Sequence, residues 1–350
     1  MKTRQLGNSN IHTAPLVFGG NVFGWTLDEA GSFRILDEFV DAGFNFIDTA
    51  DVYSRFVPGH VGGESETIIG RWLHQRGNRD KVIVATKCGM SMGPSKEGLS
   101  KTYIIAAAED SLRRLQTDYI DLYQSHCDDE ATPLEETLDS FATLIRQGKV
   151  RVIGASNYKG ARLEEALRVS QRDGLPRYES LQPLYNLYDR ADYENDLQSF
   201  CTRNNLGVIP YSSLASGFLT GKYRSSGDTQ GKARARIVER YLTPRGDGIL
   251  RALDEVAKSH ESTPASAALA WLMARPGLTA PIASATSSAQ LQSLIEATEL
   301  KLSPAEVEAL DRASSGNNFG RSGELSVASG PGPITVRKTK SNVPSQNTTT

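Results

Sequence analysis

The sequence contains few cysteines, no excess of either charge and no long hydrophobic run. Only Cys88, Cys127 and Cys201 occur among the 350 residues, and their number and spacing exclude a disulfide framework and a Cys-x-x-Cys metal or redox pair. The 39 lysines and arginines are balanced by 41 acidic residues, so no basic surface for nucleic acid or an anionic membrane is indicated. We therefore expect a protein of a reducing compartment that binds no nucleic acid.

Targeting signals and the common nucleotide-binding loops are also missing. The amino-terminal segment has no apolar core of a signal peptide, and no run approaches the roughly 18 apolar residues that a membrane-spanning helix needs. These absences predict a cytoplasmic protein with no membrane partner. No GxGxxG follows an expected strand and no GxxxxGK[ST] occurs, so neither a Rossmann site nor a P-loop is indicated. The sequence leaves the oligomeric state open.

The chain shows the alternation that is typical of an α/β barrel. Between residues 15 and 300, short apolar runs rich in β-branched residues alternate with longer segments of helical period. Eight such units predict a (β/α)8 TIM barrel, because closure of eight parallel strands leaves no sheet edge exposed. A short β-hairpin is expected ahead of the barrel, within residues 2–13. The strands are expected at 15–18, 44–47, 81–85, 119–123, 150–154, 178–182, 207–210 and 279–283, with helices including 28–42, 64–76, 101–115, 133–147 and 161–172.

The composition changes near the carboxyl terminus. Residues 323–350 consist largely of Gly, Pro, Ser, Thr, Asn and Lys, with too few apolar residues to offset the entropy of ordering. We therefore expect a single barrel domain over residues 1–322, followed by a disordered low-complexity tail.

Ionisable side chains stand where three consecutive strands are expected to end. Asp48 follows the run FNFI, Lys87 follows VIVAT, and His126 follows YIDLYQS, while Tyr53 lies in the loop five residues after Asp48. In a barrel the carboxyl ends of the strands face the active-site mouth. Each residue alone is more often a helix cap, a surface charge or a packed aromatic than a catalyst. Their joint occurrence favours a catalytic site.

These four residues suit one proton transfer. A phenol with a pKa near 10 is a poor acid at neutral pH, and a nearby lysine cation would lower that pKa. We therefore predict that Tyr53 donates a proton and that Lys87 lowers its pKa. Asp48 would hold the lysine, and a neutral His126 would bind the carbonyl oxygen that receives the proton.

The segments GFNFIDTADVYS, VIVATKCG and DLYQSHCDDEATPLEETL resemble the signature segments of the aldo-keto reductases. The resemblance continues through GKVRVIGASNY, LQPLYNLYDR and PYSSLASGFLTGKY to APIASATSSAQLQSL. It implies an NAD(P)H-dependent reductase that converts an aldehyde or ketone reversibly to the alcohol. Asp48, Tyr53, Lys87 and His126 match the catalytic tetrad of that family. Potassium-channel β-subunits share the fold and the tetrad, so a redox-sensing binding module is an alternative interpretation.

The same resemblance assigns a cofactor site for NADPH, and for NADH as well. Where many relatives place an arginine against the 2'-phosphate this sequence has Thr286, and no basic residue lies between positions 282 and 296. We therefore expect a weak preference for NADPH. The resemblance assigns Ser156, Asn157 and Gln182 to the nicotinamide carboxamide, Tyr211 to the ring, Ser212, Leu214, Gly217, Leu219, Gly221 and Lys222 to the pyrophosphate loop, and Ser284, Thr286 and Gln290 to the adenosine end.

The substrate is expected to be a small-molecule carbonyl or secondary alcohol. Trp25, Phe56, Met90 and Met92 are candidates for an apolar substrate pocket, which favours bulky ketones, although each could equally be ordinary packing. The acidic run 128–130 is typical of a solvated loop, so no metal site is assigned.

Overall fold

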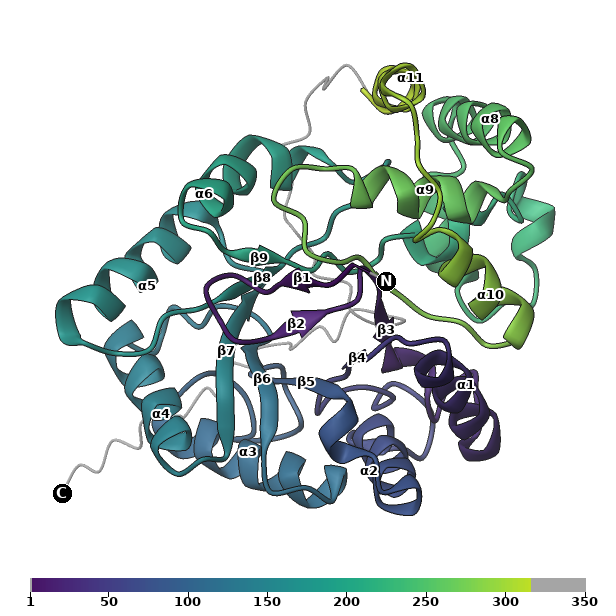
Figure 1. Ribbon diagram of the computed structural model, residues 1–350. Coiled ribbons are helices and arrows are strands. Elements are labelled where there is room, and N and C mark those ends of the chain that lie inside the picture. Colours follow the sequence, from purple (N-terminus) through teal and green to yellow (C-terminus); the bar gives the residue numbers. More distant parts are fainter. Residues whose placement is uncertain (1, 316–350) are drawn as a thin grey trace, which may run out of the picture. The chain divides into compact units, whose positions relative to one another are not determined.

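The computed structural model describes residues 2–315, in which eight parallel strands form a barrel surrounded by helices (Figure 1). The sheet has the order β10-β3-β4-β5-β6-β7-β8-β9. Its two ends meet where the Thr279 N–H donates to Val208 O at 2.8 Å and the Ile282 N–H donates to Pro210 O at 2.9 Å. The predicted (β/α)8 barrel is therefore confirmed. The strands are β3 (Val17–Gly19), β4 (Phe46–Asp48), β5 (Ile83–Cys88), β6 (Ile120–Ser125), β7 (Val150–Ser156), β8 (Ser180–Gln182), β9 (Gly207–Val208) and β10 (Ile282–Ala283).

The helices follow the predicted pattern, and two of them begin and end at the predicted residues. In α2 the first turn is acidic, the last turn is basic, and Gly77 ends the helix in the left-handed region with φ 59°. The predicted domain boundary after residue 322 and the tail 323–350 lie outside the described residues. The helices are α1 (Glu29–Asp41), α2 (Glu64–Arg76), α3 (Lys101–Leu115), α4 (Leu134–Arg146), α5 (Gly160–Asp173), α6 (Gln198–Arg203), α7 (Ala235–Val238), α8 (Pro244–Ser259), α9 (Pro264–Met273), α10 (Ser288–Glu296) and α11 (Pro304–Ser314).

Several strands extend further toward their carboxyl ends than the apolar runs predicted. β5, β6 and β7 end at Cys88, Ser125 and Ser156. Lys87 pairs with Gln124 in the ladder between β5 and β6, so polar residues that face the barrel interior still belong to the strands. Hydrophobic periodicity does not detect such residues, because the backbone rather than the side chain makes the ladder.

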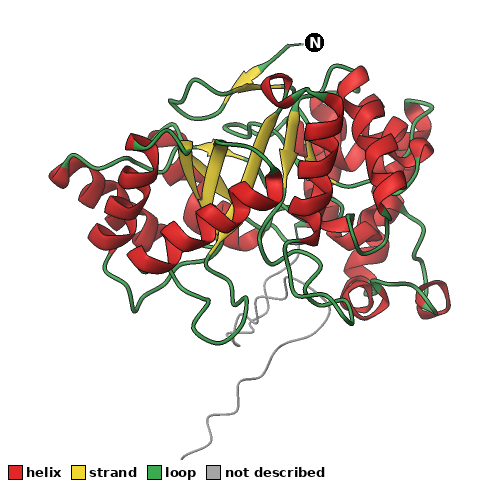
Figure 2. Ribbon diagram, turned by 90° about the horizontal axis from the view of Figure 1, so that it is seen from below, coloured by secondary structure: helices red, strands yellow, loops and turns green. Residues whose placement is uncertain are grey.

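The expected hairpin closes the amino-terminal end of the barrel. β1 (Arg4–Gln5) and β2 (His12–Thr13) pair antiparallel, and Leu6 and Ile11 pack on apolar residues near the starts of the strands, including Val17 and Phe46. Figure 2 shows the hairpin at one end of the strands. The carboxyl-terminal end is therefore the one left for a site.

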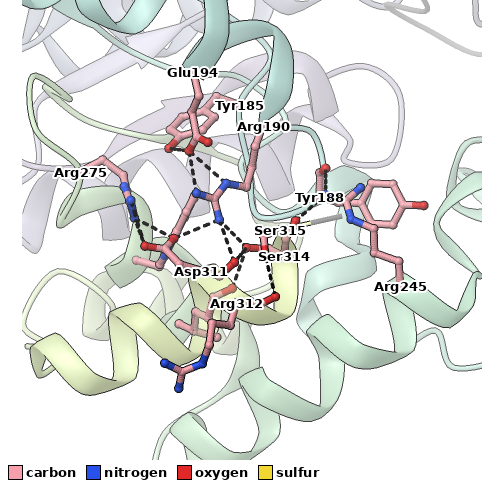
Figure 3. Close-up of polar contacts among 12 residues, drawn as sticks. Tyr185, Tyr188, Arg190, Glu194, Arg245, Arg275, Asp311, Arg312, Ser314 and Ser315 are labelled. Atoms are coloured by element: carbon pink, nitrogen blue, oxygen red, sulfur yellow. Dashed lines mark hydrogen bonds and ion pairs between the residues drawn. The ribbon is translucent and has the colours of Figure 1, made fainter. Parts of the chain in front are cut away.

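Three arginines attach the last helix to its surroundings: Arg190 lies in the loop that follows β8, Arg245 in α8 and Arg275 just after α9. Asp311 accepts from Arg275 at 2.9 Å and lies 3.0 Å from Arg190, while Arg245 donates to Ser314 O at 2.7 Å (Figure 3). Charge-assisted bonds of this kind are stronger than neutral ones, and here the arginines are mostly withdrawn from solvent. Through Arg190 and Arg245, these bonds hold the segment between β8 and α6 against α11.

Within residues 2–315, no helix combines the length and apolar character that crossing a bilayer requires.

Two helical glycines give a matched test of packing. A Cβ at Gly70 would overlap the backbone of Arg114 at the end of α3, whereas the nearest atom to a Cβ at Gly248 is Arg251 Nη2 at 4.0 Å. We expect Gly70→Ala to lower the free energy of unfolding by about 1 to 3 kcal/mol because the helices cannot separate without loss of packing. Gly248→Ala should raise it by roughly 0.5 to 1 kcal/mol through helix propensity. Urea unfolding measures both values, and equal midpoints for the two variants would contradict the close approach of α2 and α3.

Candidate active site

Lys87 lies at the centre of the polar groups at the carboxyl end of the barrel. Its Nζ donates to Asp48 Oδ2 at 2.7 Å, to Thr49 O at 2.7 Å and to Tyr53 OH at 3.1 Å. The Lys87 side chain is fully buried and that of Asp48 is 1% exposed. β4 and β5 are neighbours in the sheet, and they bring the predicted aspartate, tyrosine and lysine together.

The second carboxylate oxygen of Asp48 is held by two amides. Gln182 Nε2 donates to Asp48 Oδ1 at 2.9 Å and Gln124 Nε2 donates to it at 3.2 Å. A buried carboxylate needs such partners on both oxygens. The sequence reasoning missed Gln124, although a glutamine within the apolar strand β6 was a signal for it.

His126 follows β6 directly and lies beside the tyrosine. The ring centroids of Tyr53 and His126 are 6.0 Å apart with an interplanar angle of 75°. Burial and the charge of Lys87 hold the pKa of His126 well below its usual range. The imidazole is therefore neutral at pH 7, as the proton-transfer scheme requires.

The pKa of Tyr53 differs from the prediction. Burial raises it above the usual value, Lys87 lowers it and Asp48 raises it, so the net shift is upward. Lys87 lowers the pKa as predicted, but burial, which was not predicted, outweighs the lysine. Burial also lowers the pKa of Lys87, but Asp48 and Tyr53 outweigh it and the net shift is upward. The phenol therefore keeps its proton and the ammonium keeps its charge.

The residues expected at the nicotinamide form one hydrogen-bonded group. Asn157 Nδ2 donates to His126 O at 2.9 Å, and Tyr211 OH donates to Asn157 Oδ1 at 2.9 Å. Ser156 Oγ donates to Gln182 O at 2.8 Å. Asn157 has φ 56°, a left-handed conformation that costs energy and is common at functional sites. The structure thus brings these four residues together beside His126.

Backbone strain is concentrated in the loop after β9. Ser212, Ala215 and Ser216 have φ of 55°, 48° and 58°, and Gly217 follows with 95°. Non-glycine residues in this region cost roughly 1 to 3 kcal/mol each and persist only where the surroundings fix them. Asn186 Nδ2 contributes by donating to Ser212 O at 3.0 Å. Leu214, Leu219 and Gly221 lie in the same strained segment.

Three cations lie close together after this loop. Burial lowers the pKa of Lys222, and the charges of Arg234 and Lys232 lower it further. Within residues 2–315 none of the three forms an ion pair with an acidic side chain. The guanidinium of Arg234 stacks on Trp25, 5.3 Å from the ring centroid. The sequence reasoning missed Lys232 and Arg234, although the basic run GKARAR was a signal for them.

The residues expected at the adenosine end gather near the start of α10. Gln290 Oε1 accepts from Thr286 N at 2.9 Å and from Thr286 Oγ1 at 3.1 Å, while Ser284 Oγ donates to Gly19 O at 2.7 Å. A helix amino terminus favours an anion.

The four candidates for the substrate pocket do not all lie together. Trp25 and Phe56 contact edge to face, with ring centroids 4.9 Å apart. Met90 is half-buried in the loop after β5, and Met92 lines a separate cavity beside Gly62 and Asp51.

Two residues of the acidic run 128–130 have protein partners. Asp128 pairs with Arg162 at 3.0 Å, and Asp129 accepts from Thr132 Oγ1 at 2.6 Å and from Leu99 N at 2.7 Å. Across the described part of the chain, no three His, Cys, Asp or Glu side chains are arranged to hold a metal ion.

Comparison with known proteins finds one family across almost the whole barrel. Residues 15–315 match the model of the aldo/keto reductase family. The chain is 36% identical over 310 residues to the uncharacterized oxidoreductase YrpG of Bacillus subtilis, an alignment that covers 86% of this chain and 92% of that protein. It is 31% identical over 308 residues to a probable voltage-gated potassium channel subunit beta of Arabidopsis thaliana, with 86% and 92% covered. It is 30% identical over 319 residues to the aryl-alcohol dehydrogenase GME11368 of Pestalotiopsis microspora, with 87% and 80% covered.

The lowered pKa of His126 predicts a loss of stability in acid. Below about pH 6.5 this histidine is protonated in the unfolded chain. In the folded protein it stays neutral until the pH falls to its lower native pKa. The stabilising contribution of the neutral imidazole is therefore complete above about pH 6.5 and is lost as pH falls. Relative to His126→Asn, the free energy of unfolding should fall by up to about 1.4 kcal/mol per pH unit in that window. Urea unfolding of both proteins between neutral and mildly acidic pH measures the difference, and a difference independent of pH would show that His126 titrates normally in the fold.

Proposed function

Because this chain belongs to the aldo/keto reductase family, we propose that it is a nicotinamide-dependent reductase that interconverts an aldehyde or ketone with the alcohol. The observation that carries the proposal is the buried contact of Lys87 with both Asp48 and Tyr53. A fully buried lysine that touches a phenol is suited to proton transfer, because its charge stabilises the phenolate that remains.

The chemistry divides between the cofactor and the chain. A bound NADPH or NADH supplies hydride to the carbonyl carbon. Tyr53 holds a proton on its hydroxyl and delivers it to the carbonyl oxygen, and neutral His126 donates a hydrogen bond to the same oxygen. Lys87 stabilises the resulting phenolate, and Asp48 keeps Lys87 charged and in place. Gln124 acts one step further out as a positioning residue, since among the described residues its side chain bonds to Asp48 and Gln182.

The residues present fit a dinucleotide. Asn157, Ser156 and Tyr211 would hold the nicotinamide end. The amide nitrogen of Gln182 is bound to Asp48, so its oxygen is the group that remains for a carboxamide. Lys222, Lys232 and Arg234 would bind the phosphates, because unpaired cations held close together repel one another until an anion neutralises them.

The substrate that fits best is a bulky, apolar carbonyl. Trp25 and Phe56 present a half-buried aromatic pair in the loops after β3 and β4. The relative from Pestalotiopsis microspora is named as an aryl-alcohol dehydrogenase, which favours aromatic aldehydes and alcohols as the first compounds to assay.

A redox-sensing binding module is the second candidate function. It is favoured by the similarity to a potassium channel subunit of Arabidopsis thaliana. Turnover with a panel of aromatic and aliphatic carbonyls separates the two functions. Tight cofactor binding without turnover on any of them would favour the sensor.

The role of Tyr53 is tested by removing one hydroxyl group. Tyr53→Phe should retain cofactor affinity but lose carbonyl reduction by about 100-fold to 10,000-fold, the usual contribution of a positioned general acid. Tyr119→Phe is the matched control, because Tyr119 lies between Arg79 and Arg151 directly before β6, at the opposite end of that strand from His126. Steady-state kinetics and cofactor titration measure both effects. Near-native turnover of Tyr53→Phe on every substrate would contradict the assigned proton donor.

Thr286 should set the cofactor preference. Its hydroxyl offers one neutral donor where an arginine would grip a 2'-phosphate through paired charged bonds. We expect use of both NADPH and NADH, and we expect Thr286→Arg to raise the NADPH to NADH ratio of kcat/KM about 5-fold to 30-fold. A wild-type ratio above about a thousandfold, near 4 kcal/mol, would show that another cation already binds the 2'-phosphate.

A further inference from the structure

The loop after β8, residues 183–192, contacts the start of the segment proposed to hold the cofactor pyrophosphate. The Tyr211 N–H donates to Pro183 O at 2.9 Å, and Asn186 Nδ2 donates to Ser212 O at 3.0 Å. The loop after β8 is itself held against α8 and α11 by the network in Figure 3. It therefore gives the residues that follow β9 a fixed support.

The Asn186 side chain is fully buried and uses every hydrogen-bonding position of its amide. Its Oδ1 accepts from Tyr188 N at 2.8 Å and from Asp189 N at 2.9 Å. Its Nδ2 donates to Asp189 Oδ2 at 3.1 Å and to Ser212 O at 3.0 Å. An amide has two donors and one oxygen with two lone pairs, so no position is left over. Because two backbone N–H groups fix the oxygen, the end of the amide that faces Ser212 is the donor.

The bond from Asn186 acts on a strained peptide. Ser212 has φ 55°, a left-handed conformation that costs a serine energy. Its carbonyl also accepts from the Ala215 N–H at 2.7 Å, so two donors orient this peptide. Because a peptide is planar and trans, the Ser213 N–H points in the opposite direction from Ser212 O. Within residues 2–315 the backbone N–H groups of Ser213 and Leu214 have no hydrogen-bond partner, and successive N–H groups in such a turn suit an anion.

We propose that Asn186 is a positioning residue for the pyrophosphate of the nicotinamide cofactor. By holding Ser212 O, it keeps the Ser213 N–H directed away from the loop after β8, where a phosphate oxygen can accept from it. Asn186 does not touch the cofactor, because it is fully buried and its amide has no free position. Without this bond, the peptide after Ser212 can turn to relieve its strain and withdraw the donor. The inference rests on the proposed function only in that a nicotinamide dinucleotide binds.

Calorimetric titration of the full chain with NADPH, NADH and ADP-ribose tests this role. Asn186→Ser keeps an oxygen that can accept from the N–H groups of the turn but is too short to reach Ser212 O. We expect it to raise the dissociation constants of all three ligands by a similar factor, about 5-fold or more, because all three carry the pyrophosphate. Asn186→Asp keeps the shape of the side chain and the accepting oxygen, so it replaces the serine variant if that variant does not fold, with the same expected loss.

Asn45→Ser is the matched control. Asn45 Nδ2 donates to a backbone carbonyl, His12 O, at 3.3 Å, and Asn45 directly precedes β4 at the opposite end of the barrel. Its substitution should leave the dissociation constants of all three ligands unchanged.

A double substitution separates the route through the Ser212 peptide from general destabilisation. Glycine adopts positive φ at no steric cost, so Asn186→Ser should weaken binding by a smaller factor in a Ser212→Gly background than in wild type. A purely structural role would lower the melting temperature and give additive effects on binding.

Equal dissociation constants of wild type and Asn186→Ser overturn the inference. Additive effects in the double variant also overturn it, as does a loss for NADPH and NADH that ADP-ribose does not share. If wild type binds a dinucleotide but reduces no carbonyl, the proposed reductase activity fails while the inference stands. If wild type binds neither NADPH nor NADH, both are overturned.

Discussion

The buried ion pair of Lys87 and Asp48 is the interaction on which the site depends. Taking two charges out of water costs several kcal/mol per ion, so a pair like this persists only where further hydrogen bonds satisfy both groups. Thr49 O and Tyr53 OH accept hydrogen bonds from the Lys87 ammonium. The side chains of Gln124 and Gln182 donate hydrogen bonds to the Asp48 carboxylate. These partners come from β6, β8 and the loop after β4. The closed barrel is therefore the condition for the pair, since closure brings side chains from β4, β5, β6 and β8 to one point in the barrel interior.

The amino-terminal end of the barrel contributes to stability, and the carboxyl-terminal end carries the candidate active site. At the amino-terminal end, Leu6 and Ile11 of the hairpin cover apolar side chains, and the hydrophobic effect favours closure. At the carboxyl-terminal end, polar residues occupy the last positions of the strands, and strained backbone is concentrated between Ser212 and Gly217. Apolar burial at the amino-terminal end and under the surrounding helices stabilises the fold and offsets the backbone strain at the carboxyl-terminal end. This division explains why substitutions on the helices should change the free energy of unfolding while substitutions at the strand ends should change activity.

The sequence was sufficient for the features that depend on periodicity or on strand ends. The alternating apolar periods predict the strands and helices. Asp48, Lys87 and His126 could be identified as site residues because each follows an apolar run. Gln124 was missed because one glutamine in a strand is also typical of a solvent-facing position. Lys232 and Arg234 were missed because basic residues in a loop are usually solvated, and their proximity depends on how the chain folds back. The net upward shift of the Tyr53 pKa was missed because the depth of burial, which outweighs Lys87, cannot be read from residue types.

Asp48, the last residue of β4, and Asp51, in the loop that follows, show how position decides the chemistry of a carboxyl group. They are three residues apart and equally withdrawn from solvent. The side chain of Asp48 points into the barrel, where a lysine and two amides from other strands reach it. The charge of Arg114 acts on Asp51, but Arg114 Nε donates to Glu66 Oε2 at 2.6 Å. The strands fix the partners of the Asp48 carboxylate, so this group serves as the charge that holds Lys87. Neither carboxyl oxygen of Asp51 has a hydrogen-bond partner among the described residues, and burial raises the pKa of this carboxyl well above its usual range.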